Sequence, residues 1–379
     1  MITLSTRKTV PNDPLSARAL FSSRRLRLAR DTRRLTQTAL ADQVGVSPAA
    51  ISQYEAGDAR PAPDTLASIA RVLEFPVDFF ALNALPSGRA LIDGGRDRTK
   101  GYFRSLRSTS PADRNMSLAL AEMVQDVAIV LDGVVRLPAL DVPSISQLGG
   151  GSPESAAALL RAHWGLAPGP IPNVVEVLES HGVVCARYHL GSHSVDAFSV
   201  PFARRPVVVL GDDKDQKDRE RFSAAHELGH LVVHTIEHAD IASKAVEGEA
   251  NAFAAEFLMP AEVIVDELPQ TAEWDVLLTL KVKWQVSLGA LLFRAKTLGR
   301  MSPERYTQAM KYMSMRGWRR TEPGNLGPAE TPRLLGEALN LAVSHGTDLQ
   351  RLSTATGWPL PELQDLLRSS SDSRPTLTL

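Results

Sequence analysis

Two histidines and a glutamate stand at a spacing that suits metal chemistry. The string His226-Glu227-Leu228-Gly229-His230 is an HExxH motif. Residues four apart share one face of a helix, so His226 and His230 can offer imidazole nitrogens to one zinc ion. Glu227 would face the water at the metal and serve as general acid and base in hydrolysis. The pentapeptide alone is moderately specific, so its surroundings must support it.

A catalytic zinc site needs a third protein ligand and an open fourth position. The stretch EGEANAFAAEFLMP predicts a second helix with candidate carboxylates at Glu247, Glu249 and Glu256. We favour Glu247, because it begins the helix, where a carboxylate also interacts well with the helix dipole. His234 is the alternative, but it lies about 6 Å along the helix axis from His230. A straight helix does not easily bring three imidazoles to one ion.

Other patterns predict the elements that position this motif. The segments VVCARYHL, SVDAFSV and PVVVLGD are short and β-branched, which predicts a small sheet before the HExxH helix. Upstream, SPESAAALLRAHWG and PNVVEVLESHG predict two amphipathic helices. The chain after Pro260 is mostly helical in pattern, and TDLQRLSTATGWPLPELQDLL indicates a small helical pair near the end.

Residues 24–80 carry a second strong pattern. RRLRLARDTRRL predicts a basic helix, and TQTALADQVGV predicts a capped helix that ends at Gly45. SPAAISQYEAG follows, with Ser47 as N-cap and Pro48 at the first helical position. Two short helices joined around Gly45 predict a helix-turn-helix. PAPDTLASIARVLEFPVDFF supplies two further helical segments that would close a five-helix unit.

The stretch TQTALADQVGVSPAAISQYEAG resembles the repressor/Cro-like helix-turn-helix family of the xenobiotic-response-element type. The resemblance implies that the helix from Ser47 to Ala56 enters the DNA major groove and that Arg30 pairs internally with Glu55. It places five residues near double-stranded DNA: Gln37, Ser47, Ala49, Ser52 and Gln53. Gln53 is the best base reader, since its amide can pair bidentately with adenine. We also expect the basic first helix to contact phosphates, and a homodimer is a further expectation.

The stretch from about Ser155 to Pro260 resembles the ImmA/IrrE family of metallopeptidases. The motifs that carry this resemblance are GPIPNVVEVLESHGV, VDAFSV, RRPVVVL, RFSAAHELGHLVVH and EGEANAFAAEFLMP. It implies zinc at His226, His230 and Glu247, with Glu227 as general acid/base. Members characterised as proteases cleave helix-turn-helix repressors. The segment WDVLLTLKVKWQVSLGALLFRAKTLGRMSPERY resembles the family's helical extension, for which packing is favoured over a second DNA-binding hairpin.

Composition limits the classes of protein that fit. The chain has 379 residues, 44% of them apolar and 22% charged, so it is globular with about two or three domains. Residues 1–110 hold 17 Lys and Arg against 10 Asp and Glu, an excess of +7 that leaves −8 for the rest of the net −1. The N-terminal third is therefore the candidate partner of a polyanion, with a solvated basic surface as the alternative.

One cysteine, Cys185, excludes an intrachain disulfide. No stretch reaches the roughly 18 apolar residues of a membrane span, and the first residues lack the apolar core of a signal peptide. We therefore expect a cytoplasmic protein without a membrane partner.

We predict a multidomain fold: an N-terminal all-α helix-turn-helix domain, then an α+β gluzincin-like metallopeptidase domain with a small sheet and a helical C-terminal extension. The predicted boundaries are 20–85 for the helix-turn-helix, 86–152 for a linker with a bridging helix, 153–300 for the metallopeptidase, 301–370 for the extension and 371–379 for a disordered tail.

The predicted function is that of a DNA-binding regulatory zinc metalloendopeptidase that cleaves a protein partner, such as a repressor, to control stress or mobile-element genes. The alternatives are a non-proteolytic transcriptional regulator whose zinc domain senses a ligand or binds a protein, and an antitoxin-like binding module. No motif identifies the group that stabilises the oxyanion. His234, Arg219 and Tyr188 are candidates.

Overall fold

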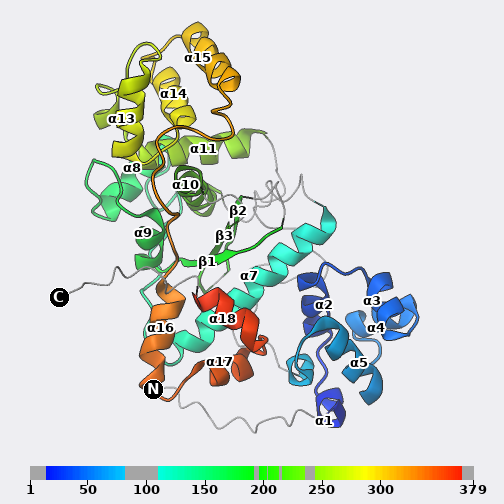
Figure 1. Cartoon of the computed structure of the whole chain (residues 1–379). Helices are drawn as coiled ribbons and strands as arrows, with labels where there is room; N and C mark the ends of the chain where they lie inside the picture. The colour runs from blue at the N-terminus through cyan, green and yellow to red at the C-terminus, as the bar shows by residue number, and fades with distance from the viewer. Residues whose placement is uncertain are drawn as a thin grey trace, which may run out of the picture.

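A small sheet lies at the centre of the chain, with helices on both of its faces (Figure 1). The computed structural model describes residues 14–81, 110–191, 196–202, 204–212, 216–234 and 244–368. The three predicted strands are confirmed as β1 (Val184–Tyr188), β2 (Ala197–Val200) and β3 (Val207–Gly211). β3 lies between the other two, parallel to β1 and antiparallel to β2. The predicted disordered tail lies outside the described residues.

The sheet separates two hydrophobic cores, because successive side chains of a strand point to opposite faces. Val207 and Val209 belong to one core and Val208 and Leu210 to the other, and all four are buried. The second core contains helices α8 (Pro153–His163), α9 (Val174–Ser180), α10 (Lys217–Val233), α11 (Lys244–Leu258), α12 (Ala261–Ile264), α13 (Trp274–Trp284), α14 (Leu288–Thr297) and α15 (Pro303–Met315). The HExxH helix is α10, and it packs against β2 and β3.

The N-terminal helices form the predicted helix-turn-helix unit. They are α1 (Pro14–Ala19), α2 (Ser23–Thr32), α3 (Gln37–Val44), α4 (Pro48–Ala56), α5 (Pro63–Leu73) and the 3-10 helix η1 (Val77–Ala81). Gly45 ends α3 with a φ of 81°, a left-handed conformation that favours glycine. Ser47 caps α4, its hydroxyl accepting a hydrogen bond from the amide of Ala50. Both features confirm the predicted turn.

Helix α7 (Pro111–Asp132) lies at the centre of the first core. It is the bridging helix predicted within residues 86–152, and most of it is buried. It contacts α2 on one side and the C-terminal helices α16 (Leu334–Val343) and α17 (Leu349–Thr356) elsewhere. The region that composition marked as a linker thus includes a core helix, while residues 82–109 lie outside the described residues.

Two arginines of the basic first helix pair with acidic residues of α7. Arg24 pairs with Glu122 at 2.6 Å, and Arg25 pairs with Asp126 at 2.8 Å, both acids being on α7. Both members of the second pair are buried, so removal of either one would leave an uncompensated charge at a cost of about 3–5 kcal/mol. Burial lowers the pKa of Arg25, although Asp126 opposes that shift.

The next arginines of the chain also have internal carboxylate partners. Arg30 pairs with Glu55, Arg33 with Glu362 on α18 (Leu360–Arg368) and Arg34 with Asp113. Arg24, Arg25, Arg33 and Arg34 thus hold the helix-turn-helix unit against the rest of the chain, and the expected contact of this helix with DNA phosphates stays a prediction.

The predicted C-terminal helical pair, α17 and α18, is confirmed. Its geometry repeats that of α3 and α4: a helix of 8 residues, a left-handed glycine, two more residues and a helix of 9 residues. Gly357, with a φ of 75°, takes the place of Gly45. The outer side of α18 carries acidic groups, with Asp365 exposed and Glu362 held by Arg33. This pair packs on α7 and β1.

These contacts divide the predicted C-terminal extension between two cores. Helix α15 packs in the second core through Ala309 and Met313, whereas α16, α17 and α18 pack in the first core with the N-terminal unit. The predicted boundaries at 300 and 301 therefore do not coincide with a change of core.

Among the described residues, no single helix is long and apolar enough to span a membrane. One pair of helices, α13 with α14, has the length and apolar composition together, but it is bent by 102°.

Two buried glutamates exchange helix caps between α9 and α16. Glu330 accepts hydrogen bonds from the amides of Val174 and Val175 at the start of α9, at 2.7 and 3.1 Å. Glu179 on α9 accepts from the amides of Arg333 and Leu334 at the start of α16, at 2.9 and 3.2 Å. Each carboxylate satisfies amides that have no partner inside a helix. The exchange ties the C-terminal helices to the second core.

Burial raises the pKa of Glu179 to about 8, although the amides of Arg333 and Leu334 oppose the shift. A carboxyl group whose pKa is raised by folding contributes stability below its unfolded value of 4.5 and loses it as the pH rises through about 8. The side chain of Glu179→Gln cannot titrate, so we predict that this variant does not lose stability in this way as the pH rises. Relative to the variant, the wild-type free energy of unfolding should fall between about pH 5 and pH 8.

Urea unfolding across this pH range measures the difference. Glu176→Gln on the same helix is the control, because Glu176 is exposed. Profiles of wild type and Glu179→Gln that run parallel across the range would contradict the assignment.

Candidate metal centre

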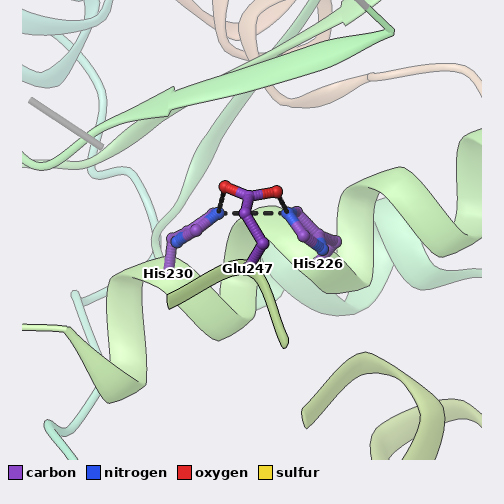
Figure 2. A group of neighbouring side chains, drawn as sticks. All are labelled: His226, His230 and Glu247. Carbon is purple, nitrogen blue, oxygen red and sulfur yellow. Dashed lines mark hydrogen bonds and ion pairs between the residues drawn. The ribbon is translucent and has the colours of Figure 1, made fainter. Parts of the chain in front are cut away.

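The structure brings His226, His230 and Glu247 together (Figure 2). The two histidines lie one turn apart on α10, and Glu247 lies in the first turn of α11. The Nε2 atoms of the histidines are 3.0 Å apart, and the Glu247 oxygens lie 3.5 Å from Nε2 of His226 and 3.6 Å from Nε2 of His230. A tetrahedral zinc ion with bonds of about 2.0–2.2 Å separates its ligand atoms by about 3.3–3.6 Å. The two distances from Glu247 fall in this range, and the distance between the Nε2 atoms is about 0.3 Å below it, so the three groups can meet around one ion after a small shift of the rings.

The hydrogen bonds behind the ring nitrogens also suit a metal. Nδ1 of His226 lies 3.0 Å from the side-chain oxygen of Asn251, which can only accept, so Nδ1 carries the proton and Nε2 keeps a lone pair. Nδ1 of His230 lies 3.0 Å from Nδ1 of His234, and Nε2 of His234 lies 3.0 Å from Glu249. This chain gives His230 the same orientation, with Nε2 directed at the common point.

Glu247 supplies a further test of fit. Its buried Oε1 atom has no hydrogen-bond partner among the described residues, which is costly for a carboxylate unless a cation satisfies it. Burial by itself would raise the pKa of Glu247, but the adjacent His226 and His230 outweigh burial and hold that pKa well below its usual range. The carboxylate is therefore ionised, as a metal ligand must be.

The other predicted candidates have different roles. Glu249 binds His234, and Glu256 pairs with Arg294 on α14 and accepts from the amide of Ala261. His234 is buried behind His230, where burial and the neighbouring His230 lower its pKa to about 4. It supports His230 without facing the point shared by the two Nε2 atoms. His238 lies outside the described residues.

Glu227 is buried one residue after His226, and its Oε2 accepts a hydrogen bond of 2.6 Å from the Ser199 hydroxyl on β2. The bond fixes the carboxylate, since both groups are buried. Ser199 lies in the strand pattern VDAFSV but was not predicted as a functional residue, because it is 28 positions from Glu227 and local spacing does not link the two. Asn251 was detectable, since it follows Glu247 by four residues and shares its helix face.

Gly229 permits the close approach of α11 to α10. A Cβ atom there would lie 3.1 Å from the carbonyl oxygen of Ala250 and 3.1 to 3.2 Å from Phe253. Such contacts are tighter than ordinary van der Waals contacts, so a side chain at this position would push the two helices apart by a few tenths of an ångström. The small residue in the middle of the HExxH motif therefore sets the distance from the two histidines to Glu247.

The predicted DNA-contacting residues lie on α3 and α4. Ser47, Ala49, Ser52 and Gln53 are exposed on one helix, which lies on the far side of α2 from α7 (Figure 1). Gln37 differs from the other four, because its amide nitrogen donates to Glu55 at 2.8 Å. Glu55 is also held by Arg30 through two hydrogen bonds, at 2.6 and 2.9 Å, as the resemblance implied. Gln37 thus supports the internal pair.

Removal of a ligand should weaken zinc binding at this cluster. We predict that Glu247→Gln lowers zinc affinity by more than the roughly 10–100-fold typical of residues that only support a ligand, while Glu249→Gln falls within that range. Competition with a chromogenic chelator measures both. Glu262→Gln is the control, because Glu262 is exposed beyond the end of α11. Equal zinc affinity of Glu247→Gln and Glu262→Gln would rule out Glu247 as a ligand.

Comparison with known proteins finds two family models in this chain. A helix-turn-helix model matches residues 26–80, which span α2 to η1. The model of the M78 peptidases, described as an IrrE N-terminal-like domain, matches residues 178–296, which include the sheet, α10 and α11. No curated protein matches the chain. The chain therefore carries a helix-turn-helix domain followed by an IrrE N-terminal-like domain of the M78 peptidase type.

Proposed function

We propose that this protein is a DNA-binding regulatory zinc endopeptidase that cleaves a protein partner, such as a helix-turn-helix repressor. The observation that carries the proposal is the meeting of His226, His230 and Glu247 beside the buried carboxylate of Glu227. The same chain exposes the helix that would enter DNA. Peptidase chemistry in a chain with a DNA-binding domain suits regulation better than digestion.

The side chains around the cluster have distinct tasks in this proposal. Zinc, when held by His226, His230 and Glu247, would act as a Lewis acid that polarises the peptide carbonyl. Glu227 would take a proton from the attacking water and pass it to the leaving amine nitrogen, so that the peptide bond yields a carboxylate and an amine. The Ser199 hydroxyl holds one carboxylate oxygen of Glu227 and leaves the other for this transfer.

The positions of the three candidates for oxyanion stabilisation favour a second function, that of a regulator that does not cleave. His234 lies behind His230, Tyr188 lies near Arg33 and Glu362, and Arg219 pairs with Asp196. Hydrolysis of a peptide needs a donor beside the developing oxyanion. A regulator whose metal site binds a ligand or a partner without cleavage is therefore the alternative.

Cleavage separates the two functions. We predict that the zinc-loaded protein cuts the repressor encoded beside it, or its own chain, and that Glu227→Gln lowers the rate by about 10²–10⁴-fold, the typical contribution of a general base. Fragments are followed by mass spectrometry, with Glu262→Gln as the control. If neither wild type nor Glu227→Gln cleaves while both regulate the same genes, the endopeptidase proposal fails and the non-proteolytic regulator stands.

Ser199→Ala is a further variant for the same cleavage experiment. It retains Glu227 but removes the hydrogen bond that fixes the carboxylate, so the rate should lie between those of wild type and Glu227→Gln. Unchanged zinc affinity in this variant shows that the effect concerns Glu227 rather than the metal ligands.

DNA binding is tested with sequences selected from a random pool. We predict that Gln53→Ala costs about 1–3 kcal/mol and relaxes specificity at one base position, because an amide that pairs with a base edge is lost. Electrophoretic mobility shifts at fixed salt measure the affinity. Gln350→Ala is the matched control, because Gln350 is exposed on α17, outside the helix-turn-helix unit. A uniform loss of affinity at all positions would show that Gln53 contacts the DNA backbone instead.

A further inference from the structure

A cleft of about 810 Å³ lies beside the metal helix. It is bounded by the start of α10, the middle of α11, the start of α14 and the segment from Trp318 to Leu326. That segment belongs to the connection between α15 and α16, drawn in orange in Figure 1. The peptidase chemistry proposed above assigns no role to the segment from Trp318 to Leu326.

The wall formed by residues 318–326 is anchored at two points. The Glu322 carboxylate accepts from Lys281 at 2.7 Å and from the amides of Leu288 and Gly289 at the start of α14, at 2.7 and 3.2 Å. The Trp318 ring packs edge-on against Trp274, with centroids 5.2 Å apart. The wall is therefore held in place before any ligand arrives, which lowers the entropy lost on binding.

The cleft carries more positive than negative charge. Its lining includes five cations and three carboxylates, an excess of two. All three carboxylates already have cationic partners: Asp196 pairs with Arg219, and both Asp218 and Glu322 pair with Lys281. Lys217, Arg319 and Arg320 form no ion pair within the part of the chain that the structure describes. Their charges are therefore available to an anionic ligand.

Apolar side chains form the rest of the lining. Phe222, Met259 and Phe293 contribute to it, and Phe293 is 42% exposed although it is a large apolar residue. A ligand that matched both features would place apolar groups against these rings and carboxylates against the cations.

The cleft reaches the metal site through two residues. Asn251 lines it and also holds Nδ1 of His226, and Ser223 lines it one helical turn before His226. A segment bound in the cleft would therefore lie within one side chain of His226.

We propose that this cleft binds a segment of the protein substrate in which acidic side chains stand next to apolar ones. The proposal rests on the endopeptidase function and adds the class of sequence that the protein selects. Arg319 and Arg320 are the specificity-determining residues, because they line the cleft, form no ion pair with another described residue and lie on its anchored wall.

Peptide binding tests the proposal without turnover. The full chain carrying Glu227→Gln is titrated with a short fluorescein-labelled peptide of Leu and Glu, and with a matched peptide in which every Glu is Gln. Fluorescence anisotropy should show about tenfold tighter binding of the acidic peptide. This preference should vanish when Arg319→Gln and Arg320→Gln are combined. Lys311→Gln combined with Arg316→Gln is the control, because both residues are exposed on or next to α15 and do not line the cleft.

Several results would overturn this assignment. They are equal binding of the two peptides, no saturable binding below about 1 mM, or the same loss in the control pair. A duplex oligonucleotide whose affinity falls tenfold only in the Arg319 and Arg320 variant would assign the cations to DNA instead. The endopeptidase function is judged separately by cleavage: charge preference without cleavage removes that function alone, and cleavage without charge preference removes the cleft assignment alone.

Discussion

The contact between Gly229 of α10 and the backbone of Ala250 on α11 is the constraint on which the rest of the site depends. Because neither helix can approach as closely with a Cβ atom at position 229, this contact sets how far Glu247 lies from the two histidines. It also places Asn251 and Glu249 where they hold His226 and, through His234, His230. The close crossing of α10 and α11 thus positions the third candidate ligand and the residues that hold the two histidines.

The sheet connects the crossing of α10 and α11 with the rest of the molecule. One of its faces packs in the core of α10 and α11, and β2 brings Ser199 to Glu227. Its other face packs in the core that the helix-turn-helix unit shares with α7 and the C-terminal helices. Buried ion pairs such as Arg25 with Asp126 fix that unit in place. The exposed helix α4 and the metal cluster are therefore parts of one packed structure, although they lie far apart in the sequence.

Local patterns were sufficient to predict much of this fold. The HExxH spacing, the glycine at position 45 and the β-branched runs around Val184 and Val207 each follow from short-range rules, and the structure has the predicted elements there. Partners distant in the sequence were not predictable. The excess of cations in the N-terminal third includes Arg24 and Arg25, which pair with Glu122 and Asp126, about a hundred positions away. Composition gives the number of charged residues but not the partner with which each one pairs.

The central claim is that the crossing of α10 and α11 builds a zinc site from two imidazoles and one carboxylate. X-ray absorption at the zinc edge on the full chain loaded with one equivalent of zinc tests it most directly. We expect a shell of nitrogen and oxygen at about 2.0–2.2 Å with the multiple scattering of two imidazoles and no sulfur. A six-oxygen shell, or a spectrum with fewer than two imidazoles, would contradict the account.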